Sequence, residues 1–242
     1  MNGLISILKK FEDNRANRNY SQWNFEAVAD CFAPCAEEIL LGGYFLVNDN
    51  IIIDIGALEL YYHEEEGEIK DYIMYHTNEH PSRSKIFVLE GGVPYFEFGS
   101  FNFHQSGIDV TFENSDKKYR ASFLIRSYRV LKKGDDLKDC QDIFDACSTH
   151  LFDDMFYKGI SLGFGSSITW INYNKGGSII SCPRRNVAEY YFNEQHKIVK
   201  AIAKISEEEY QKNKSRYIKI NGKYFKQDMR RWQFKRENII EK

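Results

Sequence analysis

A tight turn between two apolar runs most constrains how this chain can fold. The first run covers 44–47, the second covers 51–58, and the polar residues Asn48, Asp49 and Asn50 separate them. Asn and Asp tolerate the backbone conformations that tight turns require. Aromatic and β-branched residues dominate the two runs, as they do in buried strands. The pattern predicts an antiparallel β-hairpin.

The other segments predict an α+β fold, a single domain built on a curved, mostly antiparallel β-sheet with flanking helices. Apolar residues recur at helical spacing over 25–41, where Pro34 is expected to kink or divide the helix. Helical patterns also cover 137–154 and 197–205. Apolar runs predict further strands at 84–89, 93–98, 107–113, 119–131 and 178–182.

Three segments of the chain differ in composition. Residues 1–24 are an amphipathic stretch followed by a polar run, which predicts a helical N-terminal arm. Residues 25–205 carry most of the predicted elements and form the main domain. Residues 206–242 form a basic, aromatic C-terminal tail, in which ten Lys and Arg and one Asp over 212–236 give a local charge of +9. Such a tail can bind a phosphate backbone. Alternatively, its aromatic rings can pack on the domain while its lysines stay in solvent.

Composition limits the partners and cofactors. The formal net charge is −2, so binding to nucleic acid would depend on local patches rather than on an overall attraction. The sequence shows no secretory signal and no apolar run long enough to span a bilayer, so no membrane partner is expected. Its five cysteines include no Cys-x-x-Cys pair, and we expect a reduced, cytoplasmic protein without a metal or cofactor.

Three kinds of polar side chain are candidates for chemistry. Glu59 and Arg126 each close a predicted strand, and Asp71 and His76 form an Asp-x4-His between them. A carboxylate, an imidazole and a guanidinium that converge on one pocket are a common set for acid–base chemistry. We therefore expect an enzyme rather than a scaffold. Each residue by itself also suits a structural role, as a strand-end acid, a hydrogen-bonded histidine or an ion-paired arginine.

Several short motifs occur in the order found in one family of DNA-repair enzymes. They are Leu41-Gly42, Glu59-Leu60-Tyr61, Asp71-x4-His76, Arg83 with Phe87, Gly92-x-x-Tyr95, Leu124-Ile125-Arg126 and Cys182-Pro183-Arg184. In this order and spacing, residues 25–187 resemble the alkyladenine (3-methyladenine) DNA glycosylases of the mammalian type. The resemblance implies a glycosylase-like main domain and a monofunctional N-glycosidic hydrolase that excises an alkylated or otherwise damaged base.

The resemblance also implies a role for each matched residue. Glu59 would activate the attacking water, and Arg126 would hold that water and keep the carboxylate ionised. Tyr61 and His76 would sandwich the extruded base, whose positive charge suits aromatic faces. The other implied site residues are base-binding Glu97 and Asp109, and nucleic-acid-binding Arg83, Tyr95, Phe98 and Arg184. The implied partner is double-stranded DNA.

Two departures from the family pattern leave alternatives open. Glu97 stands where the family has a second stacking tyrosine, and Asp109 stands near the position of a family asparagine. Both changes fall on the base pocket rather than on the hydrolytic residues. One alternative is a catalytically silent relative that binds nucleic acid or protein. Another is a hydrolase of free modified nucleosides, which the near-neutral net charge suits. The sequence leaves the oligomeric state undefined.

Overall fold

The structure is a computed structural model that describes residues 2–71, 73, 74, 77, 93–104, 107–138, 142–146, 149–151, 167–184, 190–192, 198–201, 206–212, 217–220, 223–226 and 230–242. Within these ranges the fold is α+β, with a curled antiparallel sheet and a few helices, as predicted. The predicted strand at 84–89 and the candidate residues His76 and Arg83 lie outside the described ranges.

Eight of the described strands form one sheet. A continuous path runs in the order β3-β4-β5-β2-β1-β7, and β13 joins β2 to β8 beside this path. The strands are β1 (Gly43–Val47), β2 (Ile51–Glu64), β3 (Phe101–His104), β4 (Gly107–Thr111), β5 (Tyr119–Lys132), β7 (Ile168–Asn172), β8 (Ile179–Cys182) and β13 (Gln233–Arg236). Three smaller pairs are β9 (Tyr190–Phe192) with β10 (Ile198–Ala201), β11 (Tyr217–Ile220) with β12 (Lys223–Lys226), and β6 (Ile143–Phe144) with β14 (Ile240–Glu241).

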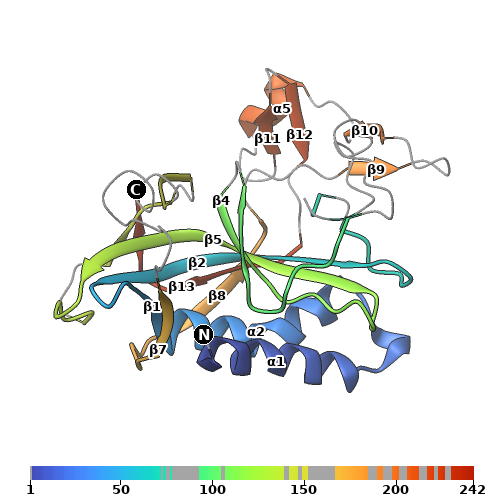
Figure 1. The fold of residues 1–242 in the computed structure, drawn as a ribbon. Coiled ribbons are helices and arrows are strands. Elements are labelled where there is room, and N and C mark those ends of the chain that lie inside the picture. Colours follow the sequence, from blue (N-terminus) through green and yellow to red (C-terminus); the bar gives the residue numbers. More distant parts are fainter. Residues whose placement is uncertain are drawn as a thin grey trace.

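Two helices, α1 (Asn2–Ala16) and α2 (Phe25–Leu41), lie side by side on one face of the sheet (Figure 1). A short 3-10 turn, η1 (Tyr20–Gln22), connects them, and α5 (Glu207–Lys212) lies later in the chain. The ring of Phe11 in α1 is 6.0 Å from Phe32 of α2 and 5.6 Å from Tyr62 of the sheet. The predicted N-terminal arm is therefore part of the hydrophobic core.

Local chemistry explains why α2 has the predicted bounds. The Asn24 side chain accepts a hydrogen bond from the Ala27 amide at 2.9 Å, which caps the first turn. The Gly42 amide donates to the Glu38 carbonyl at 2.8 Å at the other end. Pro34 lies inside the helix on its exposed side, and the helix continues through it. The expectation that Pro34 divides the helix is wrong.

The predicted hairpin is confirmed as β1 and β2, which pair in antiparallel register from Val47 opposite Ile51. Asn48 and Asp49 adopt positive φ angles of 50° and 54° in the connecting turn. Asn and Asp adopt this left-handed conformation at a lower cost than bulkier residues do. The turn residues therefore fix the register that places the rest of β2.

β2 is longer than its predicted range of 51–58, whereas β5 matches its predicted range of 119–131 to within one residue. They pair along their length, with a register shift around Ala57. Beyond that shift, Leu58 and Leu60 pack into the core that holds the helices, so Glu59 and Tyr61 point to the opposite face. Glu59 therefore lies inside β2, and Arg126 lies inside β5. The prediction that they close their strands is wrong, because alternating polar residues on the second face resemble a strand end in sequence.

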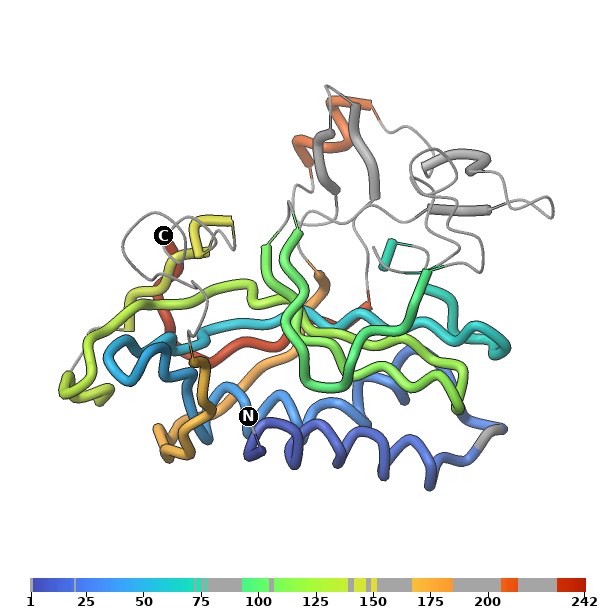
Figure 2. Tube along the Cα trace, in the orientation of Figure 1, coloured from blue at the N-terminus to red at the C-terminus, as the bar shows by residue number. Residues whose placement is uncertain are grey.

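The last segment of the chain is part of the sheet rather than an appendage. β13 pairs with β2 on one side and with β8 on the other. In Figure 2 the red tube of β13 runs between β2, from the first third of the chain, and β8, from its last third. Trp232 and Phe234 are 1% and 2% exposed and belong to the core. The aromatic residues at this end of the predicted tail thus pack on the domain.

Tertiary contacts also override three sequence patterns. Residues 93–98, predicted as a strand, form a loop. The predicted helix over 137–154 contains the strand β6, and the predicted helix over 197–205 contains the strand β10. β6 pairs in parallel with β14 near the end of the chain, and such a distant partner is invisible to local periodicity.

Candidate active site

The face of the sheet opposite the helices carries a row of polar side chains across several strands. Gln233 of β13 lies opposite Glu59 of β2. Glu59 lies opposite Leu124 of β5, and Leu124 lies opposite Asp109 of β4. Directly opposed residues share a face of a sheet, so Gln233 and Asp109 flank Glu59 on its two sides. Gln233, Glu59 and Asp109 are all buried.

Glu59 contacts two of the residues that the sequence assigns to the site. Its Oε1 lies 3.3 Å from the Nε of Arg126, and its Oε2 accepts a hydrogen bond from the Tyr61 hydroxyl at 3.2 Å. The Glu59 side chain is 0% exposed, whereas that of Arg126 is 14% exposed and Tyr61 is half-buried. The carboxylate is thus hidden from solvent behind two partners that are themselves partly accessible.

Tyr61 is a phenol rather than a phenolate at neutral pH. Burial raises the pKa of Tyr61 well above its usual range, and the nearby charge of Glu59 raises it further. The protonated hydroxyl can therefore donate to the carboxylate. Glu59 therefore accepts a hydrogen bond from Tyr61 and forms an ion pair with Arg126.

Asp109 forms a second acidic position in the same row. Its Oδ2 lies 3.4 Å from the Nε2 of His104 in β3, and Ser122 of β5 donates to the same oxygen at 3.4 Å. Asp109 itself is 4% exposed. The predicted base-binding Asp109 therefore lies in the same row as Glu59, two strands away from it.

The Arg184 guanidinium packs over the ring of Tyr61. It lies 4.8 Å from the Tyr61 ring centre and forms an ion pair with Asp71, with Nη1 2.7 Å from Oδ2. Burial by itself would raise the pKa of Asp71, but the guanidinium groups of Arg184 and Arg230 outweigh it and lower the pKa. Arg184 and Asp71 are both 0% exposed. In this arrangement Arg184 holds Tyr61 and Asp71 in place; its predicted contact with nucleic acid stays a prediction.

The remaining predicted residues lie in the loop before β3. The Tyr95 hydroxyl donates to Glu65 at 2.6 Å, and the Arg120 guanidinium lies 4.1 Å from the Tyr95 ring centre. Phe98 packs against the core, and Glu97 is exposed. The contacts described for this loop join it to Glu65, Thr111, Glu113 and Arg120, and none of them joins it to Glu59. A role for Glu97, Tyr95 or Phe98 in ligand binding stays a prediction.

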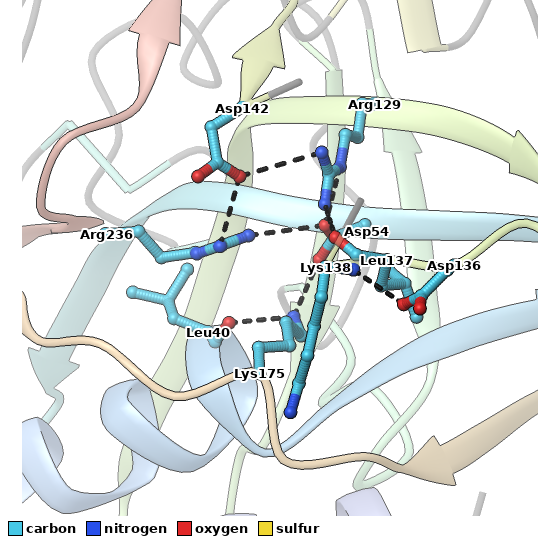
Figure 3. A network of polar contacts seen from close by, with 9 residues as sticks. All are labelled: Leu40, Asp54, Arg129, Asp136, Leu137, Lys138, Asp142, Lys175 and Arg236. Atoms are coloured by element: carbon cyan, nitrogen blue, oxygen red, sulfur yellow. Dashed lines mark hydrogen bonds and ion pairs between the residues drawn. The ribbon is translucent and has the colours of Figure 1, made fainter. Parts of the chain in front are cut away.

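A separate charge cluster surrounds Asp54, earlier in β2 (Figure 3). The Oδ1 of Asp54 accepts a hydrogen bond from Lys175 Nζ at 2.7 Å. Its Oδ2 accepts hydrogen bonds from Arg129 Nε at 2.8 Å and from Arg236 Nη1 at 3.3 Å. Burial lowers the pKa of Lys175 to about 8, although the charge of Asp54 partly offsets this effect. The cluster joins β2, β5, β13 and the segment after β7. Sequence reasoning missed it because its members are far apart in the chain.

Gln233 is a second residue that sequence reasoning missed. It is 0% exposed, and neither its Oε1 nor its Nε2 has a hydrogen-bond partner among the described residues. One sequence signal does point to it. Apolar Trp232 and Phe234 alternate with polar Gln233 and Lys235, which is the period of a half-buried strand.

Two open surface grooves, of about 420 and 680 Å³, lie away from Glu59 and include none of the predicted site residues in their walls. The described side chains include no group of three or more His, Cys, Asp or Glu arranged to hold a metal ion. No helix in the described part of the chain is long and apolar enough to cross a membrane. Cys31, Cys35 and Cys182 are free thiols.

Searches against protein-family models, curated proteins and solved structures find no match to this chain.

Proposed function

We propose that this protein is a DNA glycosylase-like hydrolase that cleaves the N-glycosidic bond of an extruded, damaged nucleotide. Glu59 is the general base that activates water, and Arg126 is the cation that orients the carboxylate and the water. Tyr61 contributes a hydroxyl to the carboxylate and one face of its ring to the base. The proposal requires neither a metal nor a cofactor.

One observation carries the proposal: the buried Glu59 carboxylate is paired with Arg126 at 3.3 Å. A base of this kind needs its cation within reach of a shared water, and a separation of more than about 10 Å would exclude that arrangement. The partial exposure of Arg126 and Tyr61 supports access for a ligand, because both residues contact the buried Glu59 carboxylate.

The chemistry suits such a carboxylate. Loss of the base leaves positive character on the sugar, and an adjacent anion stabilises that charge while it accepts a proton from water. The neighbouring Asp109 adds a second acidic group to the same row. A cationic, alkylated base would be attracted to this acidic face and to the Tyr61 ring.

A hydrolase of free modified nucleosides is the second candidate. The burial of Arg184 in an ion pair with Asp71 favours it, because this arginine was predicted to contact nucleic acid. The net charge of −2 also favours a small substrate over a polyanion.

The test is a Glu59→Gln variant assayed for base release under single-turnover conditions. The substrates are a duplex that carries one 7-methylguanine and free 7-methylguanosine. Glu59→Gln keeps the shape of the side chain and removes the base, so release should fall by about a hundredfold or more. Glu37→Gln, an exposed carboxylate on α2, is the matched control and should retain the wild-type rate.

The outcomes separate the candidates. Release from the duplex that depends on Glu59 supports the glycosylase, and release from the nucleoside alone supports the second candidate. Equal rates for Glu59→Gln and wild type contradict the assignment of Glu59. Duplex binding without release by the wild type would indicate a silent relative.

A further inference from the structure

Gln233 occupies a rigid position next to Glu59. It begins β13 and lies directly opposite Glu59 on one side and Cys182 on the other. Cross-strand neighbours of this kind have Cβ atoms about 5 Å apart. The residues before and after it, Trp232 and Phe234, are buried in the core on the helix side. Alternation along the strand therefore directs the Gln233 side chain to the same face as Glu59.

The flanking contacts hold this position in place. The Trp232 indole Nε1 donates to the Phe25 carbonyl at 2.8 Å, and the Leu60 amide donates to the Trp232 carbonyl at 2.7 Å. The guanidinium of Arg184 lies 5.1 Å from the Trp232 ring centre. The backbone of Gln233 is thus fixed by strand pairing on both sides and by a packed tryptophan immediately before it.

The Gln233 amide is nevertheless unpaired. The side chain is 0% exposed, and its Oε1 and Nε2 have no hydrogen-bond partner in the described part of the chain. An amide offers two donor and two acceptor positions, and burying them without partners destabilises a fold. Buried polar groups in native proteins are nearly always satisfied, so such a group beside a candidate catalytic carboxylate needs an explanation.

We infer that Gln233 determines ligand specificity in the Glu59 site by pairing with an adjacent donor and acceptor on the edge of the bound heterocycle. The inference rests on the proposed function for its ligand, an extruded nucleotide. A carboxamide presents N–H and C=O side by side, which complements a ring edge that carries the same two groups in the opposite order.

The spacing of the row places the Gln233 amide within reach of a ring next to Glu59. Neighbouring strands are about 5 Å apart, so Gln233 and Asp109 lie about 5 and 10 Å from Glu59 on opposite sides. A heterocycle next to Glu59 can therefore reach the amide, while Asp109 adds negative charge to the same face from the far side of Glu59. Gln233 would form hydrogen bonds with the edge of the ring, while the charges of Glu59 and Asp109 would favour a cationic ring.

The test uses duplex probes with a 2′-fluoro sugar, which resists cleavage, so that binding is measured apart from hydrolysis. One pair compares hypoxanthine with 1-methylhypoxanthine, and another compares adenine with N6,N6-dimethyladenine. Each pair differs by methyl groups that block the donor of one edge. The wild-type protein should prefer the unblocked member of at least one pair by about tenfold or more.

Gln233→Met keeps the length of the side chain and removes the amide. This variant should lose the preference between paired probes, while Gln22→Met, an exposed glutamine in η1, should keep it. The melting temperature of Gln233→Met should rise by about 2–4 °C, because an unpaired buried amide has been removed. Gln233→Leu provides the same comparison if the methionine variant folds poorly.

Three results would overturn the inference. One is an absence of preference in the wild-type protein for both pairs, and another is the same preference in Gln233→Met. The third is a lower melting temperature for both Gln233 variants, which would mean that the amide already makes native hydrogen bonds, including bonds to a buried water. Because the probes are not cleaved, a discriminating but inactive protein would contradict the proposed function and leave the role of Gln233 standing.

Discussion

Two polar clusters in β2, around Asp54 and around Glu59, show how differently one strand can use a buried carboxylate. Asp54 accepts three cationic donors at 2.7, 2.8 and 3.3 Å. Glu59 has contacts of 3.3 Å with Arg126 and 3.2 Å with Tyr61, and it lies next to the unpaired amide of Gln233. The first cluster is closely bonded within the protein. The second lies beside Gln233, whose side-chain amide has no hydrogen-bond partner among the described residues.

The two clusters differ in whether the buried charge supports the fold or faces a group that a ligand could pair with. A fully bonded network stabilises its surroundings, since loss of one member leaves the others buried without a partner. An unpaired buried amide such as that of Gln233 destabilises the free protein and gains from a ligand that pairs with it. On this basis we propose that Asp54 is structural and that Glu59 is functional.

The largest effect expected on the fold is that of Asp54→Asn. The variant would leave Arg129, Arg236 and Lys175 without their shared carboxylate and should lower the free energy of unfolding by about 3–5 kcal/mol. Urea denaturation followed by circular dichroism measures the change. Asp49→Asn is the control, since Asp49 is 78% exposed and should contribute less than about 1 kcal/mol. A loss no greater than that of the control would make the Asp54 cluster unimportant for stability.

Arg126→Met tests whether the cation paired with Glu59 is needed for activity. It should reduce base release by about a hundredfold, because the cation that orients Glu59 and the water is lost. Arg126→Lys restores the charge and should recover part of the rate. Single-turnover release at a temperature where each variant is folded separates this effect from instability. If methionine and lysine variants both retain the wild-type rate, Arg126 only supports the structure.

The smallest of these effects concerns Lys175 and pH. Its pKa is lowered to about 8 in the folded protein from an ordinary value of 10.5, so the unfolded chain binds more protons between these values. Stability should therefore rise with pH in this window. Relative to Lys175→Met, the wild-type free energy of unfolding should increase by about 1–2 kcal/mol from pH 8 to pH 9.5. Denaturation curves at several pH values test this, and a constant difference would mean that Lys175 titrates normally.

Local chemistry made part of the fold predictable. Asn48 and Asp49 define the hairpin turn, and Asn24 and Gly42 define the ends of α2; these signals require no distant partner. The pairing of Glu59 with Arg126 was also anticipated, because the resemblance implied that Arg126 holds the water beside Glu59. The position of Glu59 inside β2 was not anticipated, since polar residues on the second face of a strand look like strand ends.

The missed features depend on distant segments. Gln233 gained its significance only when β13 was found between β2 and β8, and the basic residues around it had favoured a separate tail. The segment 137–154 has a helical pattern, but β6 is held there by β14 and by Phe144, whose ring lies 4.9 Å from the guanidinium of Arg129. Tertiary pairing of this kind outweighs local propensity.

The most direct test compares Glu59→Gln with Asp54→Asn in one assay, as the rate of base release per folded molecule. The expected result is that Asp54→Asn is much less stable but retains the wild-type rate when folded, while Glu59→Gln is folded and loses about a hundredfold or more of the rate. If Glu59→Gln releases the base at the same rate as folded Asp54→Asn, the two carboxylates do not differ in role and the account is contradicted.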